Sequence, residues 1–382
     1  MKTMARVTGL AVALTAAGIA GAAAQQRGVT AGEVLFGMHT DLSGVAATYG
    51  VSSSNGVKMR FEELNAAGGV EGRKLRVIVE DQAYQVPKAV QACNKLINRD
   101  KVFAFVAPLG TPMNNACFKD QFAAGVPNLF PLSAARSMFE PYERLKFYGA
   151  ASYTDQIRSA IEYFVKTKGK KAVCAMYQDT DFGKEILAGA ELQTKKLGIK
   201  LVETAAHKPT DQDFTAGLTK LKTAGCDLIA MGTIVRDTII PYTAARKMGW
   251  TNVDFVGSAA AYDHVVGAAP GMDGFYGMGL TEMPYADSKL ESVRQFVATY
   301  KDKYKIDPNI GAVYGYVAAD LAAQGLINAG KNLTTDSFVA GMEKIKDYHD
   351  IFGGPPRSRR GRRSRRSTPR ACSSAASTPS RA

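Results

Sequence analysis

Side chains able to perform acid–base or nucleophilic chemistry are few in this sequence and lie far apart. Asp179 and Asp181 are two residues apart and could form a carboxylate pair for proton transfer. Asp181 is also placed to cap a helix that begins at Phe182, and we prefer this interpretation because aspartate is favoured at helix N-termini. The four histidines are widely separated, and the sequence contains neither a GxSxG nor an HExxH motif. These residue types do not predict an enzyme.

A different chemistry, the binding of a small anion, is indicated near the N-terminus. Residues 34–38 form a short apolar run typical of a buried strand, and a polar loop with two glycines follows at residues 41–50. Apolar residues then recur at helical spacing over 57–64, with the N-cap expected at one of the serines 52–54. A strand, a loop and a helix N-terminus together present N–H donors to an anion. The loop has no GxGxxG and no P-loop lysine, which argues against a nucleotide.

The elements that would position these residues follow from the alternation of short apolar runs with longer helical stretches. In the first part of the chain the predicted strands are 75–79, 102–106 and 126–130, and the predicted helices are 87–98 and 113–124. The pattern restarts near Gly149, with strands at 170–177, 199–205, 227–231, 253–257 and 276–280. Three helical stretches without clear strands between them follow at 290–304, 314–329 and 335–345. We therefore expect an α/β fold of two lobes, each a mostly parallel sheet flanked by helices.

The first 24 residues have the organisation of a secretory signal peptide. Lys2 and Arg6 supply positive charge, residues 10–19 form an apolar segment, and alanines at 22–24 precede Gln25 as a cleavage site. The apolar segment is shorter than the roughly 20 residues that cross a bilayer, which argues against a transmembrane anchor. The mature protein is therefore expected to be exported, and to be periplasmic in a bacterium with two membranes.

The net charge of +13 comes largely from the end of the chain. Residues 357–382 contain nine arginines and no acidic residue, and without these and the two cationic residues of the signal peptide the charge is +2. The body of the protein is therefore not expected to bind nucleic acid. The tail is either a disordered arm that seeks nucleic acid or the product of a shifted reading frame after Pro356. We favour the shifted frame because aromatic and acidic residues disappear there together, and we expect the tail to be disordered.

Four of the five cysteines lie outside this tail, and they allow three disulfide pairings in an exported protein. We prefer Cys93–Cys117 and Cys174–Cys226, because these pairs keep each bridge within one lobe. Buried free thiols are the alternative. The cysteines do not have the spacing of a metal site, and no metal or cofactor is expected.

Several segments at the start of the chain carry a family resemblance: Asp41–Gly44, Tyr49–Gly50, Asn55–Gly56 and Leu64–Gly72. They resemble the opening of periplasmic solute-binding proteins of the branched-chain amino acid (leucine-binding) type, which serve ATP-driven ABC importers. The similarity extends from about Glu33 to about Tyr348 and implies a two-lobed, type I periplasmic binding protein-like fold. It places residues 25–150 and 283–350 in lobe 1 and residues 151–282 in lobe 2. It also implies a monomer that captures a small ligand by hinge closure and delivers it to a membrane permease, without a catalytic step.

The resemblance assigns the residues that would hold a ligand carboxylate. Gly110 and Thr111 stand where the family uses a backbone N–H and a hydroxyl for this purpose. Ser133, Ala134 and Ala135 match the second carboxylate-holding loop. Thr111 is also a candidate N-cap of the helix predicted at 113–124, a role compatible with binding because the helix start directs free N–H groups outward.

The resemblance also assigns walls around the ligand. Tyr49 matches an aromatic residue of the first loop, and Phe182 matches the aromatic residue that closes the site from the other lobe. Tyr153 and Tyr262 could add further apolar surface. Arg236 follows a strand that brings another wall residue; the alternative for it is a solvated charge, unless its guanidinium turns inward to a carboxylate.

One departure from the family pattern affects the expected ligand. Amino-acid binders of this family place an acidic residue after the strand that ends here at Gly257, where it pairs with the ligand ammonium. This chain has Ser258 at that point and no acid before Asp263. A buried ammonium without a counter-charge costs several kcal/mol, so we expect an aromatic or aliphatic acid without an α-amino group, provided that Asp263 does not reach the ligand. A ligand-sensing receptor for amino acids or amides is the alternative function.

Overall fold

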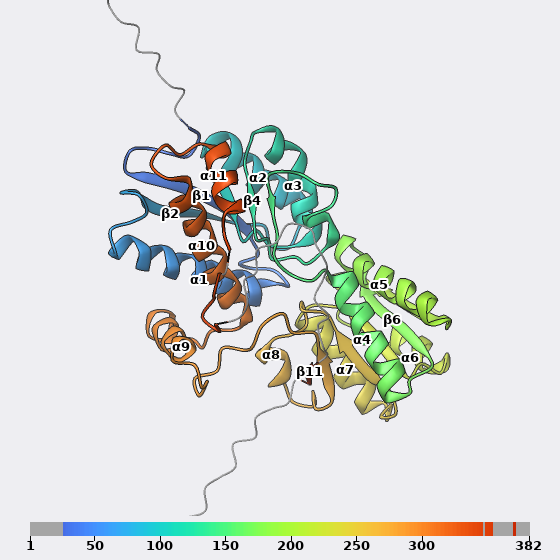
Figure 1. Ribbon diagram of the computed structural model, residues 1–382. Coiled ribbons are helices and arrows are strands. Elements are labelled where there is room, and N and C mark those ends of the chain that lie inside the picture. Colours follow the sequence, from blue (N-terminus) through green and yellow to red (C-terminus); the bar gives the residue numbers. More distant parts are fainter. Residues whose placement is uncertain (1–25, 347, 354–369, 372–382) are drawn as a thin grey trace, which may run out of the picture.

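The first lobe is built on a parallel sheet. The computed structural model describes residues 26–346, 348–353 and 370–371, shown in Figure 1. Among these, five strands form the sheet in the order β2-β1-β3-β4-β5. They are β1 (Glu33–Thr40), β2 (Lys74–Asp81), β3 (Ala104–Val106), β4 (Asn128–Leu129) and β5 (Lys146–Phe147). The helical elements of this part are α1 (Ala47–Ala66), α2 (Val86–Asn94), η1 (Lys95–Arg99), α3 (Thr111–Ala123) and η2 (Arg136–Met138).

The second lobe repeats the same architecture. Its sheet has the order β11-β10-β9-β8-β6-β7 in the described residues, and all neighbours are parallel except β10 and β11. The strands are β6 (Val173–Gln178), β7 (Leu201–His207), β8 (Leu228–Gly232), β9 (Asp254–Gly257), β10 (Phe275–Gly277) and β11 (Arg370–Ala371). The helices are α4 (Tyr153–Lys168), α5 (Asp181–Leu197), α6 (Thr215–Thr223), α7 (Arg236–Lys247) and α8 (His264–Gly267). The two parallel sheets flanked by helices confirm the predicted α/β fold of two lobes (Figure 1).

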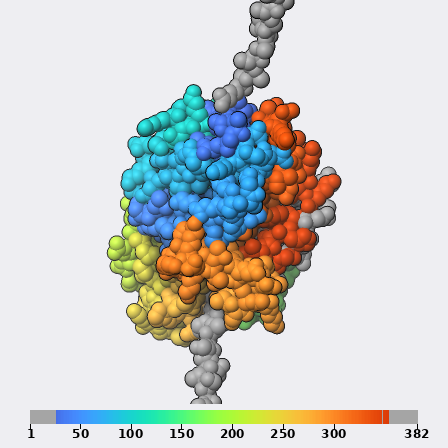
Figure 2. Space-filling model, turned by 90° about the vertical axis from the view of Figure 1, so that its left-hand side faces the viewer, coloured from blue at the N-terminus to red at the C-terminus, as the bar shows by residue number. Residues whose placement is uncertain are grey.

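The chain then returns to the first lobe through α9 (Glu291–Tyr304), α10 (Ile310–Ala329) and α11 (Thr335–Glu343). Figure 2 shows the orange segment that contains α9 against the blue surface of the first lobe. Helix α10 packs directly on α1, and glycines permit the close approach: a Cβ on Gly56 would lie 2.1 Å from Ala312 O, and one on Gly315 would lie 2.0 Å from Ser53 O. Of the described helices, α10 alone is long and apolar enough to cross a membrane, but 72% of its apolar window is buried. It is a core helix of the first lobe.

Helix starts differ from the prediction in three places. Helix α1 begins at Ala47 and not at the serines, because the Asp41 carboxylate accepts the N–H groups of Ser43, Gly44 and Ala46 and so organises the turn before it. The predicted cap serines lie inside the helix and donate to carbonyls of the preceding turn. Helix α5 is capped by Thr180, whose hydroxyl accepts from Gly183 N, so Asp181 is the first helical residue and not the cap. Helix α3 is preceded by Gly110, and Thr111 is its first residue.

Both preferred cysteine pairs form disulfides in the structure. Cys93 of α2 is joined to Cys117 of α3 with a Cα separation of 6.1 Å, and Cys174 of β6 is joined to Cys226 with a Cα separation of 5.9 Å. His39 lies beside the first bridge, and these three residues are the one group of three or more described residues whose metal-ligand atoms lie close together. Because thiolates rather than disulfides bind metals, this group is not a metal site.

The ends of the chain are described only in small part. The signal peptide predicted at 1–24 and most of the predicted tail at 357–382 lie outside the described residues. Within the tail, Arg370 and Ala371 form β11, which pairs antiparallel to β10. At these two residues the structure has a strand where we expected disorder.

His39, the penultimate residue of β1, is a buried titratable group with no hydrogen-bond partner for either ring nitrogen. Its side chain is fully buried, and the ring stands edge-on to Phe105. Burial lowers the pKa of His39 to about 3. The neutral imidazole is therefore the form that the fold accommodates.

We expect this histidine to make the protein less stable in mild acid. Between pH 6.5 and 3 the unfolded chain binds a proton at His39 that the folded chain does not, so the free energy of unfolding falls as the pH is lowered. Relative to His39→Leu, wild type should lose roughly 2 kcal/mol between pH 7 and pH 5, measured by urea unfolding. His264→Leu, at a partly exposed histidine, is the control. An equal stability difference at both pH values would contradict the expectation.

Candidate functional site

The carboxyl ends of β3 and β4 bring two hydroxyl groups together. Thr111 Oγ1 and Ser133 Oγ lie 2.7 Å apart, and the two residues are only 2% and 5% exposed. Gly110, with φ 94°, turns the chain from β3 into α3, but its N–H donates to Leu132 O. The expectation that the Gly110 N–H is free for a ligand is therefore wrong. The N–H groups in the first turn of α3, those of Thr111 and Met113, have no carbonyl ahead of them within the helix.

The loop after β4 connects the hydroxyl pair to the second lobe. Ala135 N donates to Ser133 Oγ, and Tyr153 N donates to Ala134 O over 2.7 Å. The Tyr153 ring packs against the Phe182 ring with centroids 5.0 Å apart and planes at 70°. Ala134, Ala135, Tyr153 and Phe182 are all buried in one core cluster. These residues lie next to one another where the lobes meet.

The first turn of α1 meets the loop after β9. Tyr49 Oη donates to the backbone oxygen of Tyr262 over 3.4 Å, which links the two lobes. Ser258 follows β9 directly and is fully buried, and the next backbone N–H, that of Ala259, donates to Gln156 Oε1 over 2.7 Å. Tyr49, Ser258 and Tyr262 are therefore placed at the carboxyl end of β9, on the side that faces the first lobe.

Two further side-chain pairs join the lobes. Asn115 Nδ2 of α3 donates to Asp181 Oδ2 of α5 over 2.8 Å. Arg136 Nε lies 3.3 Å from Glu185 Oε2, also on α5. The first turns of α5 thus contact the first lobe at both of these points, and the loops that carry the predicted site residues face one another.

Arg236 and Asp263 are held by neighbours in ways that the sequence did not predict. Arg236 Nη2 donates to the backbone oxygens of Pro209 and Asp211, which fixes the guanidinium to a loop of its own lobe. Asp263 is fully buried, its Oδ1 accepts from Val265 N to cap α8, and its carboxylate lies near the backbone N–H of Ile310. Burial raises the pKa of the Asp263 carboxyl. Both side chains are therefore held by the protein itself, although Arg236 Nε and Asp263 Oδ2 have no hydrogen-bond partner.

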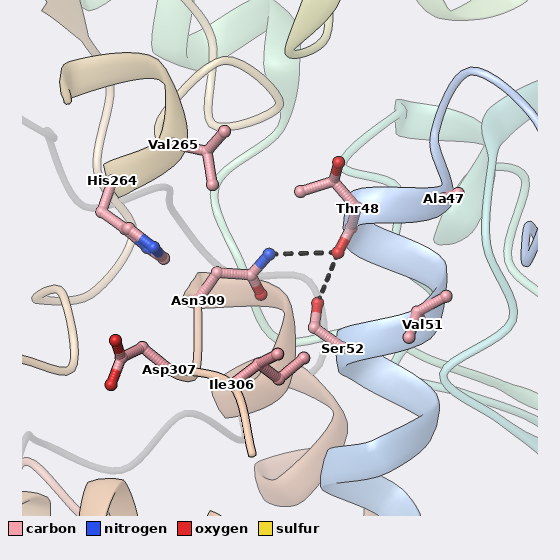
Figure 3. Close-up of a pocket in the computed structure, with 9 residues that line it drawn as sticks. All are labelled: Ala47, Thr48, Val51, Ser52, His264, Val265, Ile306, Asp307 and Asn309. Carbon is pink, nitrogen blue, oxygen red and sulfur yellow. Dashed lines mark hydrogen bonds between the residues drawn. The ribbon is translucent and has the colours of Figure 1, made fainter. Parts of the chain in front are cut away.

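A pocket of about 340 Å³ lies beside this region and is drawn in Figure 3. It is lined from α1, from α8 and from the chain before α10: Ala47, Thr48, Val51, Ser52, His264, Val265, Ile306, Asp307 and Asn309. Asn309 Nδ2 and Ser52 Oγ both donate to Thr48 O, at 3.0 and 2.7 Å, which ties its wall together (Figure 3). The pocket spans the lobe boundary, but it does not contain the residues that the sequence predicted for ligand binding.

Sequence reasoning missed a polar cluster in the second lobe. Gln178 ends β6, His207 ends β7, and Asp237 stands in the first turn of α7, where its Oδ2 accepts from Gln178 Nε2 at 2.8 Å and lies 2.9 Å from His207 Nε2. Each residue follows an apolar run that was correctly predicted as a strand. A search for polar residues at predicted strand ends would have found Gln178 and His207, but their convergence on Asp237 requires the sheet order.

The comparison with known families decides the assignment. A model of the periplasmic binding protein family matches residues 33–371. The chain belongs to this family. The Leu/Ile/Val-binding protein homolog 7 of Brucella suis biovar 1 (strain 1330) is 25% identical over 331 residues, which are 83% of this chain and 80% of that protein.

Solved structures of substrate-binding proteins have the same fold. A fatty acid ABC transporter substrate-binding protein from Thermomonospora curvata aligns with a TM-score of 0.80 and 24% identity, over 90% of this chain and 88% of that one. An ABC transporter solute-binding protein from R. palustris, in complex with benzoate, aligns with a TM-score of 0.74 and 19% identity, over 84% and 88% of the two chains. The family and the fold are those of substrate-binding proteins of transporters rather than of enzymes, and the family implies a periplasmic location.

Gly110 should be indispensable to the local geometry of this periplasmic binding protein. Its φ of 94° is unfavourable for other residues, and an added Cβ would lie 2.8 Å from Met113 Sδ. We expect Gly110→Ala to lower the free energy of unfolding by roughly 1–3 kcal/mol, measured by thermal denaturation. Gly32→Ala is the matched control, because no atom lies within 4 Å of its added Cβ. Equal melting temperatures for the two variants would show that the turn tolerates a side chain.

Proposed function

We propose that this periplasmic binding protein is the substrate-binding component of an ABC importer and captures a small carboxylate between its lobes. The observation that carries the proposal is the buried Thr111–Ser133 hydroxyl pair beside the first turn of α3. Helix N-termini attract anions through their free N–H groups and dipole, and hydroxyl donors strengthen the site. Bound carboxylates gain charge-assisted hydrogen bonds from such donors.

The ligand class follows from the acids that surround the site. Asp41 accepts three backbone N–H groups, Asp237 accepts from Gln178, His207 and Ile234 N, and Asp263 caps α8. Asp41 and Asp237 accept hydrogen bonds from the protein at both of their oxygens. Asp263 Oδ2 has no hydrogen-bond partner, but burial raises the pKa of this carboxyl and so disfavours the charged form that an ammonium needs. A ligand ammonium would therefore lack a counter-charge, so we infer an acid without an α-amino group.

The walls support an apolar body for this ligand. Tyr49, Tyr153, Phe182 and Tyr262 are buried at the lobe boundary and offer aromatic surface from both lobes. Aromatic faces and edges stabilise apolar and aromatic groups by burial. An aromatic or aliphatic acid fits these walls, in keeping with the benzoate and fatty acid named for two proteins of the same fold.

Capture would proceed by closure of the lobes about their connections. The Asn115–Asp181 and Tyr49–Tyr262 hydrogen bonds cross the boundary and would be broken when the lobes separate. A ligand that contacts both lobes favours the shut form, and hinge closure of this kind is typical of periplasmic binding proteins. The shut, loaded monomer would then deliver the acid to the membrane permease, with no cofactor involved.

The ligand class is tested by calorimetry with purified protein. We expect benzoate or hexanoate to bind, and L-leucine to bind at least about a hundredfold more weakly, because burying an unpaired ammonium costs several kcal/mol. Thr111→Val with Ser133→Ala removes both hydroxyls and should weaken acid binding about tenfold or more. Tight binding of leucine with no binding of either acid would refute the ligand class.

Closure is tested at an inter-lobe hydrogen bond. Asn115→Ala removes the bond to Asp181, which we expect to exist only in the shut form, and should lower benzoate affinity about two- to tenfold. Gln295→Ala is the matched control, since Gln295 Nε2 donates to Glu291 Oε1 over 2.9 Å within α9, away from the boundary. If the two variants bound benzoate equally well, the Asn115 contact would have no part in closure.

A further inference from the structure

The polar cluster at the ends of β6 and β7 has a fixed orientation. Asp237 Oδ2 accepts from Gln178 Nε2 at 2.8 Å and lies 2.9 Å from His207 Nε2, while Asp237 Oδ1 accepts from Ile234 N at 2.8 Å. A carboxylate accepts hydrogen bonds, so the Gln178 amide nitrogen and the His207 Nε2–H must face it. Asp237 therefore determines that Gln178 Oε1 and His207 Nδ1 are the atoms that point away from it.

The atoms that point elsewhere are two unused acceptors. Gln178 Oε1 and His207 Nδ1 have no hydrogen-bond partner, although Gln178 is fully buried and His207 is only 8% exposed. With the proton on Nε2, the Nδ1 of His207 carries a lone pair, and Gln178 Oε1 carries two. Buried polar atoms are nearly always paired, and an unpaired one is costly. Two unpaired acceptors on residues that are held by the same carboxylate indicate a missing donor.

The cluster lies on the face of the second lobe that meets the first. The residues just after β6 and β9 both reach across: Asp181 to Asn115, and Tyr262 to Tyr49. Gln178 is the last residue of β6, three residues before Asp181. The carboxyl ends of neighbouring parallel strands share one edge of a sheet, which places His207 at this edge as well.

Tyr84 lies between this cluster and the Thr111–Ser133 hydroxyl pair, where we propose that the carboxylate binds. It follows β2 in the first lobe, and its ring lies over Gly110, where an added Cβ would come within 3.6 Å of Tyr84 Cε2. Burial raises the pKa of Tyr84 far above its ordinary value, and the charge of Asp237 raises it further, which places the phenol within electrostatic range of the cluster. Tyr84 as a residue is nevertheless only partly buried. One molecule lying along Tyr84 could therefore contact the Thr111–Ser133 hydroxyl pair with one end and the Gln178–His207–Asp237 cluster with the other.

We propose that the ligand is a hydroxy acid whose hydroxyl group, remote from the carboxylate, donates to Gln178 Oε1 or His207 Nδ1, with Asp237 as the positioning residue. This rests on the proposed function, because the carboxylate end must be held at Thr111 and Ser133. A neutral hydroxyl fits better than an ammonium, since the Asp237 charge is already met by three donors. The cluster thus selects among acids that the apolar walls alone would accept equally.

The test compares acids in matched pairs by calorimetry: benzoate with 3- and 4-hydroxybenzoate, and hexanoate with 6-hydroxyhexanoate. We expect the hydroxylated member of at least one pair to bind about ten- to a hundredfold more tightly, because it fills acceptors that are otherwise unpaired. If acids bind but no hydroxylated acid binds more tightly than its parent, the inference is overturned and the proposed function stands. If none of these acids binds, both are overturned.

Variants separate recognition from a structural role of the cluster. Gln178→Met and His207→Phe keep the volume but remove the acceptors, so the affinity ratio of the hydroxylated acid to its parent should fall to about one. Thr111→Val should weaken both members of the pair by the same factor and preserve the ratio. A ratio that stays at its wild-type value in both cluster variants would contradict the inference. Melting temperatures verify folding, and the wild-type comparison decides the question should either variant not fold.

Discussion

The packing of α10 against α1 is the contact on which the arrangement of the molecule depends. The chain leaves the first lobe after β5, builds the second, and returns through α9 to lay α10 on α1. The close approach requires glycine at positions 56 and 315, where a Cβ would collide with the backbone of the facing helix. Asn309 caps α10 and also donates to Thr48 O in the first turn of α1. The same contact therefore sets the position of Tyr49, which reaches the second lobe.

The proposed site is assembled from residues at the ends of strands. Its electrostatics depend on the hydrogen bonds that the nearby aspartates make within the protein. Asp41, Asp237 and Asp263 are all nearly inaccessible to solvent. Asp41 and Asp237 accept hydrogen bonds at both carboxylate oxygens, whereas Asp263 accepts one at Oδ1 and none at Oδ2. Buried carboxylates require such partners, because desolvation without them is expensive. In the proposed site, the N–H and hydroxyl donors at the start of α3 lie in the first lobe, and the two unpaired acceptors of Gln178 and His207 lie in the second. Hydrogen-bond donors and hydrogen-bond acceptors thus lie on opposite sides of the lobe boundary.

The fold was largely predictable from the sequence, because apolar runs and helical spacing are local signals. Most strands of both lobes lie where these runs predicted them, but the two-residue strands β5 and β11 were not predicted. The cysteine pairs chosen to stay within lobes are the ones that form. Helix starts were harder, since the turn before α1 is organised by Asp41, well ahead of the expected serine cap. The Gln178–Asp237–His207 cluster was missed because Gln178 and His207 lie 59 and 30 residues from Asp237, and the three meet only through the order of β7, β6 and β8. The use of the Gly110 N–H by Leu132 likewise depends on strand pairing.

The two disulfides close loops of 24 and 52 residues, and neither bridge links one lobe to the other. Cross-links of this kind restrict the unfolded chain and brace each half separately. Oxidation in the compartment that the family implies would therefore strengthen both halves without adding a covalent cross-link between them. The disulfides thus stabilise the interior of each lobe, and the segments that connect the lobes contain neither bridge.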